Sequence, residues 1–122
     1  MNNLVQWFEI ATHDLERAKT FYATVLQKEF TFLDMPDNPM YMFSTKGEVK
    51  GSPGALVKSK DNTPCTDGTI IYFYCEDINN EIARVEKAGG KVLFPKTSIG
   101  EFGFVSQFID TEGNRIGVYS DK

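Results

Sequence analysis

The stretch VQWFEIATHDLERAKTFYATVL, residues 5–26, decides the fold, because a strand pattern passes directly into a helix pattern. In its first six residues the side chains alternate between two faces, as expected for a strand. Asp14 follows as a predicted N-cap, since its carboxylate can accept hydrogen bonds from free backbone N–H groups. Apolar residues then recur at helical spacing, which predicts an amphipathic helix from Leu15 to Leu26.

The same succession begins again in the second half of the chain. Residues Ile70–Cys75 alternate like a strand, and Asp77 is the second predicted N-cap, 63 residues after Asp14 (77 − 14). An apolar stripe predicts a second helix, which Gly89 and Gly90 end. The sequence therefore contains two copies of one strand–helix unit.

The 63-residue offset extends beyond these units, because it pairs Glu9 with Tyr72 and Gly54 with Gly117. Three further strand patterns follow each helix. We predict an α+β domain over residues 1–122, with one βαβββ module over about 1–60 and another over about 67–122. If the sheet faces opposite the helices curl together, they enclose a shared cavity. The further strands are expected at Glu29–Asp34, Tyr41–Thr45, Ala55–Lys58, Lys91–Phe94, Phe102–Ile109 and Arg115–Tyr119.

Composition excludes several classes of partner. The net charge is −4 and no block of Lys or Arg interrupts it, so we expect no nucleic acid and no membrane partner. No apolar run approaches the ~20 residues that span a bilayer. The N-terminal Met-Asn-Asn-Leu does not resemble a secretory signal. Cys65 and Cys75 are not spaced as CxxC, and two free thiols are typical of a cytoplasmic protein.

Glu9 is the residue best suited to acid–base chemistry. By strand alternation it shares a face with Trp7, and the offset places Tyr72 at the matching position of the second module. A carboxylate among aromatic rings is poorly solvated, so we expect a raised pKa and a role as general base or ligand acceptor. The alternative is that Glu9 pairs with Arg115 or Tyr72 and only holds the sheet together.

Other side chains on the same predicted faces can form the wall of a binding site. An aromatic wall suits a flat or cationic ligand, and tyrosine adds a polar group to the ring. Core packing is the alternative for at least two of the aromatic residues. The predicted ligand-binding set is Trp7, Glu9, Ile70, Tyr72, Tyr74 and Tyr119.

Three motifs resemble those of the vicinal oxygen chelate superfamily, which comprises glyoxalases, bleomycin-resistance proteins and extradiol dioxygenases. They are WFEI with DLERAKTFY (residues 7–10 and 14–22), KAGGKV (87–92) and DTEGNRI (110–116). The last is similar to the D-P-x-G-N hairpin of that family. Together the motifs cover nearly the whole chain. The resemblance implies two βαβββ modules that form a half-open curled sheet around one site.

Metal-using members of the superfamily carry His, Glu or Gln at four inward positions. Carried over to this chain, these positions fall on Trp7, Gly54 (or Ala55), Ile70 and Gly117. Divalent metals need imidazole, carboxylate or thiolate ligands, which none of these residues supplies. We therefore predict no metal ligands and no cofactor.

Three functions follow from these expectations. The first is a glyoxalase- or bleomycin-resistance-like protein that binds a small organic molecule between its modules without metal. By analogy with the superfamily we expect a homodimer. The second is a cofactor-independent lyase or isomerase with Glu9 as general base. The third is a metal-dependent lactoylglutathione-lyase-like enzyme or dioxygenase. It requires that the strand register used to assign the four ligand positions is wrong. A register shifted by one residue would turn Phe8 and Ile71 inward, and these are no better as metal ligands.

Overall fold

The computed structural model describes residues 4–46 and 51–122. The first three residues, on which the prediction about a secretory signal partly rests, lie outside the described residues. The order strand, helix and three strands occurs twice, as predicted. No helix in the described residues is long and apolar enough to cross a bilayer. The first module contains β1 (Phe8–Ala11), α1 (Leu15–Leu26), β2 (Phe30–Leu33), β3 (Met40–Phe43) and β4 (Gly54–Val57). The second contains β5 (Tyr72–Tyr74), α2 (Ile78–Val85), β6 (Lys91–Ser98), a short 3₁₀ turn η1 (Gly100–Phe102), β7 (Phe104–Ile109) and β8 (Arg115–Ser120).

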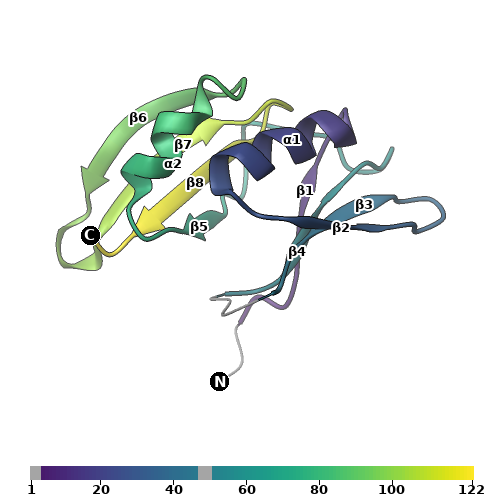
Figure 1. Ribbon diagram of the computed structural model, residues 1–122, viewed down its shortest axis with the longest axis horizontal. Helices are drawn as coiled ribbons and strands as arrows, with labels where there is room; N and C mark the ends of the chain where they lie inside the picture. The colour runs from purple at the N-terminus through teal and green to yellow at the C-terminus, as the bar shows by residue number, and fades with distance from the viewer. Residues whose placement is uncertain (1–3, 47–50) are drawn as a thin grey trace.

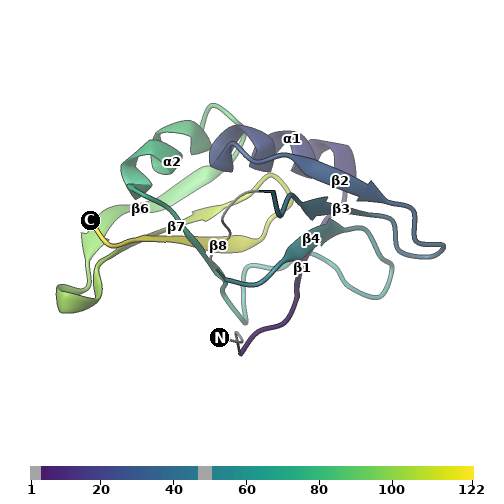
Figure 2. The same cartoon turned by 60° about the horizontal axis from the view of Figure 1, so that its bottom comes forward.

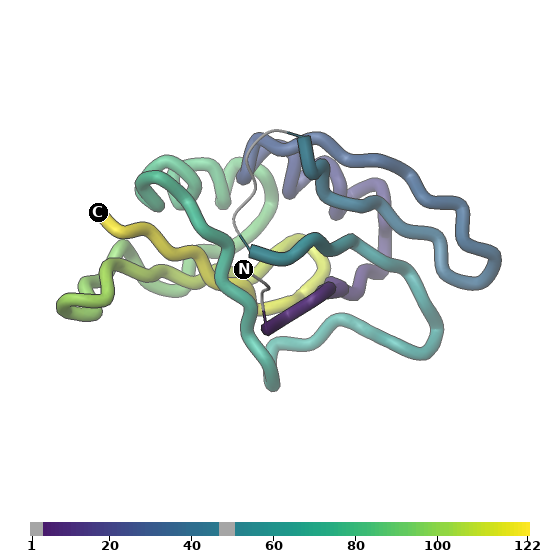
Figure 3. Tube along the Cα trace, turned by 90° about the horizontal axis from the view of Figure 1, so that it is seen from below, coloured from purple at the N-terminus to yellow at the C-terminus, as the bar shows by residue number. Residues whose placement is uncertain are grey.

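Each module forms its own four-stranded sheet, in the orders β1-β4-β3-β2 and β5-β8-β7-β6. The first and last strands of each module are parallel, and the other neighbours are antiparallel. The sheets lie side by side and neither closes on itself (Figure 1), and both helices cover one side of them (Figure 2). Figure 3 shows the connector after β4 running back from the outer end of the first module to the second. The predicted α+β class with two open modules is confirmed.

Both helices begin where the sequence predicts. The Asp14 side chain accepts a hydrogen bond from the backbone N–H of Arg17 at 3.0 Å, and Asp77 accepts one from Asn79 at 3.0 Å. These bonds satisfy N–H groups that have no partner within the first helical turn. The helices end differently, because Gln27 is left-handed (φ 54°) after α1, whereas Gly89 (φ 104°) takes up this conformation after α2.

The two modules share one core. The apolar stripes of α1 and α2 face the sheets, and aromatic rings connect the modules. Phe73 of the second module lies with its ring centroid 5.7 Å from that of Phe8 and 5.5 Å from that of Phe43. The fully buried Tyr22 contacts the rings of both Phe43 and Phe73. Neither module could therefore separate without exposing the apolar side chains of the other.

The hairpin between β7 and β8 fastens the second module to the start of α1. Glu112 accepts hydrogen bonds from the backbone N–H groups of His13 (2.9 Å) and Asp14 (2.8 Å), and it pairs with Arg17 at 2.8 Å. Burial opposes ionisation of this carboxyl, but Arg17 and the other donors outweigh it and lower the pKa of Glu112 to about 2. In the same hairpin, Asp110 accepts from the Tyr22 hydroxyl at 2.5 Å.

The structure corrects the pairing of Gly54 with Gly117. In the first module Gly54 lies beside Phe8, on the face that packs against the helices. In the second module Gly117 lies beside Tyr72, on the opposite, open face. The counterpart of Gly117 is therefore Ala55, which lies beside Glu9 on the open face. The predicted offset of 63 residues is therefore wrong for these strands, since Ala55 and Gly117 are 62 residues apart (117 − 55). A difference of one residue matters because neighbouring side chains in a strand point to opposite faces.

Candidate functional site

The predicted ligand-binding residues lie at the sheet faces opposite the helices, in two groups. Trp7 precedes β1 and donates a hydrogen bond from its indole N–H to the Glu9 carboxylate at 3.2 Å. In the other sheet, Tyr74 and Tyr119 lie with ring centroids 6.3 Å apart, and Tyr72 lies beside Gly117. No hydrogen bond or ring contact among the described residues joins the first group to the second.

Two polar residues that the sequence did not single out support the tyrosines. Gln107 donates from its side-chain amide to the Tyr72 hydroxyl at 2.7 Å. The hydroxyls of Tyr74 and Tyr119 both donate to the Asp121 carboxylate at 3.0 Å. The hydrogen bond to Asp121 raises the pKa of Tyr119. The tyrosines are therefore held as an ordered surface.

This surface is open in the single chain. Trp7 is 38% exposed, Tyr72 46% and Tyr74 38%, and Glu9 is exposed as well. The poor solvation expected for Glu9 is therefore absent from the isolated chain. A bound ligand or a second copy of the chain would have to exclude water from Glu9 to create that environment.

The four positions at which the resemblance predicts metal ligands hold no side chain that could bind a metal. Trp7 and Ile70 lie before β1 and β5, and the structure assigns the third position to Ala55 rather than Gly54. At the fourth position, a Cβ on Gly117 would lie 2.3 Å from the Tyr72 ring, so the ring fills the space of a ligand side chain. Within residues 4–46 and 51–122, no group of three or more His, Cys, Asp or Glu residues could hold a metal ion.

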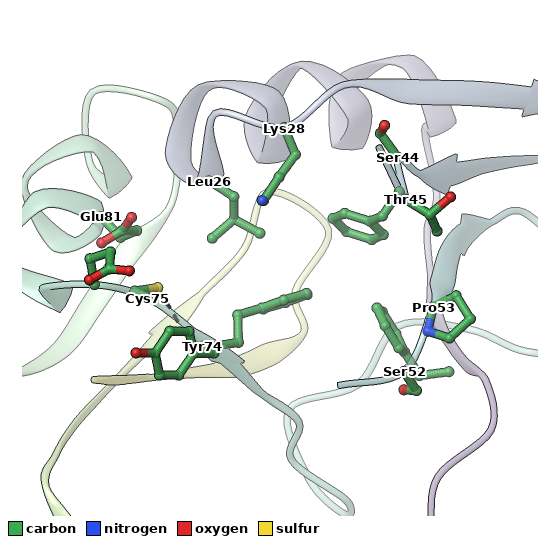
Figure 4. Close-up of a pocket in the computed structure, with 13 residues that line it drawn as sticks. Leu26, Lys28, Ser44, Thr45, Ser52, Pro53, Tyr74, Cys75 and Glu81 are labelled. Atoms are coloured by element: carbon green, nitrogen blue, oxygen red, sulfur yellow. Dashed lines mark hydrogen bonds between the residues drawn. The ribbon is translucent and has the colours of Figure 1, made fainter. Parts of the chain in front are cut away.

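A cavity of about 610 Å³ lies between the modules, near the C-terminal end of α1 and the start of α2 (Figure 4). Its aromatic lining comes from both modules, with Phe8 and Phe43 on one side and Phe73 and Tyr74 on the other. Its other lining residues are Leu26, Lys28, Ser44, Thr45, Ser52, Pro53, Cys75, Glu76 and Glu81.

The position of this cavity differs from that of the predicted site, which stays a prediction. The cavity is shared by the modules, but Phe8 and Phe73 belong to the helix-facing side of their sheets, not to the open side. Of the six predicted ligand-binding residues, only Tyr74 lines it. Strand alternation alone could not show this, because the cavity forms where the helix-facing sides of two different sheets diverge.

Charged side chains enter the cavity from opposite sides. Lys28 follows the left-handed Gln27 and points into the cavity, whereas Glu81 lies at its α2 side (Figure 4). The Glu81 side chain is only 15% exposed, and its Oε1 accepts no hydrogen bond. One feature of the sequence could have indicated that Glu81 is buried. It is three residues after Ile78 and four before Val85, so it lies on the buried face of the helix.

Cys75, beside Glu81, is not suited to nucleophilic chemistry. Its side chain is buried, with 6% of the residue exposed. Burial, followed by the nearby Glu81 carboxylate, raises the pKa of Cys75 to about 12. The thiol is therefore protonated at neutral pH, as expected of an inert cysteine.

A second, smaller pocket of about 210 Å³ contains Glu9. Arg115 and Asn114 line it as well, together with Cys65 and Asp67 of the connector. Glu9 and Arg115 do not form an ion pair, and the buried Nε of Arg115 has no hydrogen-bond partner. The pairing of these two residues, which was the alternative to a functional Glu9, does not occur. No hydrogen bond joins Glu9 to Tyr72, whose hydroxyl bonds Gln107.

Comparison with known proteins identifies similar sequences and structures. Residues 5–45 match the family model of the bleomycin resistance protein-like N-terminal segment. A glyoxylase-like domain-containing protein from Didymella fabae is 29% identical over 118 residues, which covers 93% of this chain and 91% of the relative.

Solved structures share the fold at low sequence identity. TnmS3, an antibiotic binding protein from Streptomyces sp. CB03234, superposes with a TM-score of 0.70 at 21% identity, covering 99% of this chain and 98% of its own. Glyoxalase I from Zea mays superposes with a TM-score of 0.71 at 19% identity over 94% of this chain. The chain spans 45% of the length of the maize enzyme.

Proposed function

We propose that this chain, a member of the vicinal oxygen chelate superfamily, binds a small organic molecule in the cavity between its modules and does so without a metal ion. The cavity carries this proposal. Its volume of about 610 Å³ lies within the roughly 300–1,000 Å³ of ordinary ligand pockets. Such pockets combine aromatic walls with a few polar groups, and this one offers four aromatic rings, four hydroxyls (one of them on Tyr74) and three charged side chains.

The relatives support binding in preference to metal-assisted catalysis. TnmS3 is an antibiotic binding protein of the same fold and nearly the same length. In this chain the positions of the metal ligands hold Trp7, Ala55, Ile70 and Gly117, and Tyr72 occupies the space beside the last of them. None of these four side chains can bind a metal ion, so they do not support a metal-dependent reaction.

An enzymatic alternative rests on the smaller pocket. Glu9 and Arg115 line it without forming an ion pair, so a ligand could contact both the carboxylate and the guanidinium. A lyase or isomerase with Glu9 as general base would lose turnover in Glu9→Gln. A protein that binds at the larger cavity would keep its affinity in that variant, which distinguishes the two functions.

A homodimer would cover the open sheet faces. Trp7, Tyr72 and Tyr74 form an exposed aromatic surface that a second copy could bury. We expect the molar mass of a dimer by light scattering. Tyr72→Glu should reduce it to that of a monomer, whereas Thr24→Glu on the exposed side of α1 should leave it unchanged. We also propose a cytoplasmic location, which the exposed free thiol of Cys65 favours.

The test of binding is to fill the cavity. Ser52 lines it, is half-buried and lies outside the buried core, so Ser52→Trp should occupy the space without disturbing the core. We expect the affinity for anilinonaphthalene sulfonate, a dye with an apolar ring system and one anionic sulfonate group, to fall about tenfold by calorimetry. Thr24→Trp is the matched control outside the cavity. Equal affinities of the two variants, or no dye binding to the unmodified protein, would contradict the proposed function.

A further inference from the structure

The cavity carries opposite charges on its two walls. The first module contributes Lys28, and the second contributes Glu76 and Glu81. None of the ion pairs in the described residues joins Lys28 to either glutamate. Among the described residues, Lys28 and the two glutamates therefore do not neutralise each other by direct ion pairs.

The end of α1 and the side chain of Arg84 determine where Lys28 and Glu81 lie. Gln27 ends α1 in the left-handed conformation, and the turn directs Lys28 into the cavity (Figure 4). On the other wall, Arg84 donates from Nε to the backbone carbonyl of Val25 at 3.0 Å and contacts the Glu81 carboxylate at 3.4 Å. Arg84 thus fixes α2 against the end of α1, and with it the position of Glu81.

The Glu81 carboxylate has unused capacity for hydrogen bonds. Its Oε2 makes the long contact with Arg84, and its Oε1 accepts no hydrogen bond from the described residues, although the carboxylate lies close enough to Cys75 to raise the pKa of that thiol. An ionised carboxylate has about four acceptor sites, and a poorly hydrated one is costly unless donors reach it. The terminal torsion of a glutamate is broad, so a small rotation presents an oxygen to the cavity. A cationic donor in the cavity would satisfy it.

Lys28 has complementary requirements. Its ammonium group has three donors, and it forms no ion pair with any residue that the structure describes. The rings of Phe8, Phe43 and Phe73 also line the cavity, and they favour a flat apolar body. The hydroxyls of Ser44 and Ser52, from the same module as Lys28, line it too and add donors for an acidic group.

From this arrangement we infer that the ligand is a zwitterionic aromatic molecule, with an amine held by Glu81, an acidic group held by Lys28 and its ring against the phenylalanines. This inference rests on the proposed function, because it concerns the same cavity. It goes further by naming the chemical class of the ligand and the residue that recognises each end. Recognition of the ligand by Lys28 and Glu81 requires neither a metal ion nor a second subunit.

Four indole compounds test the inference, because they share one ring and differ only in charge. Tryptophan carries both groups, tryptamine only the amine, indole-3-propionate only the acid, and indole neither. We expect calorimetry at neutral pH to show tryptophan binding about tenfold more tightly than either singly charged compound. Indole should bind most weakly.

Two variants assign the ends of the ligand. Glu81→Gln should remove the preference for tryptophan over indole-3-propionate, and Lys28→Gln should remove its preference over tryptamine. Glu86→Gln and Lys87→Gln make the same charge changes at exposed positions outside the cavity and should preserve both preferences. Lys28 is exposed, so its variant should fold even if the change at Glu81 destabilises the protein.

The outcomes separate this inference from the proposed function. Equal affinities for the four compounds, or binding of the dye without binding of tryptophan, would overturn the inference and leave a cavity that does not recognise zwitterions. Preferences that persist in both cavity variants would also overturn it. Failure of the dye and of all four compounds to bind would overturn the proposed function as well.

Discussion

The first and last strands of the two modules differ in one instructive way. In the first module Phe8 of β1 lies beside Gly54 of β4 on the helix-facing side. In the second module Tyr72 of β5 lies beside Gly117 of β8 on the open side. Similar residues in the same order therefore face opposite sides, because strand faces alternate with every residue. A repeat in sequence shows that two elements correspond, but not which way their side chains point.

The surroundings of the two rings differ accordingly. A Cβ added to either glycine would lie 2.3 Å from the neighbouring ring, so both strands require glycine for close approach. Phe8 is confined by Phe43 and Phe73, whereas Tyr72 is 46% exposed. The same contact thus belongs to the core in one module and to the surface in the other.

The largest expected effect tests whether the two modules unfold as one unit. Glu112→Ala should lower the free energy of unfolding by about 4 kcal/mol, because the fully buried Glu112 carboxylate is the acceptor for the N–H groups of His13 and Asp14 and for Arg17. Urea unfolding followed by fluorescence measures this from the other module, since Trp7 is the single tryptophan. The exposed Glu101→Ala is the control. An unchanged Trp7 transition would mean that the modules unfold independently.

The same carboxylate predicts how stability depends on pH. Because the pKa of Glu112 falls from 4.5 to about 2 on folding, the unfolded chain binds its proton at higher pH than the folded one. Stability from this group is complete above about pH 5 and is lost as pH falls towards 2, by about 3 kcal/mol in total. Unfolding curves across this range should show the loss. They should lack this component in Glu112→Gln.

The glycine substitutions sharpen the comparison of the strands directly. Gly54→Ala should cost about 3 kcal/mol, because the Phe8 ring cannot move away from the new methyl group. Gly117→Ala should cost about 1 kcal/mol or less, because the exposed Tyr72 ring can rotate towards solvent. Thermal unfolding of the two variants gives the difference. Equal losses would mean that Tyr72 is as confined as Phe8, for instance by a second copy of the chain.

The helix ends provide the smallest effect. Gln27→Gly should stabilise the protein by about 0.5–1 kcal/mol, because glycine adopts the left-handed conformation without strain. Gly89→Ala should destabilise it by about 1 kcal/mol, since a Cβ there is strained and lies 3.1 Å from Thr111. Melting temperatures that move in the same direction for both variants would contradict this assignment of the helix ends.

Sequence patterns predicted much of the fold because they depend on neighbours along the chain. The N-caps Asp14 and Asp77 follow from a local need of the helix for acceptors. The strand preceding each helix follows from alternation. The structure extends β6 to Ser98, beyond the predicted Lys91–Phe94 and through Pro95. As the edge strand of its sheet, β6 tolerates this proline.

The order of the elements, the helix faces and the chemistry at the metal-ligand positions were thus determined by the sequence itself. Only the tertiary structure decided that Ala55 rather than Gly54 corresponds to Gly117, that Glu9 is exposed, and that Lys28 and Glu81 face one cavity. The physical reason is that local pattern specifies which face of an element is apolar. The gap between two sheets depends on how their strands pair and how the modules pack, which involves residues far apart in the chain.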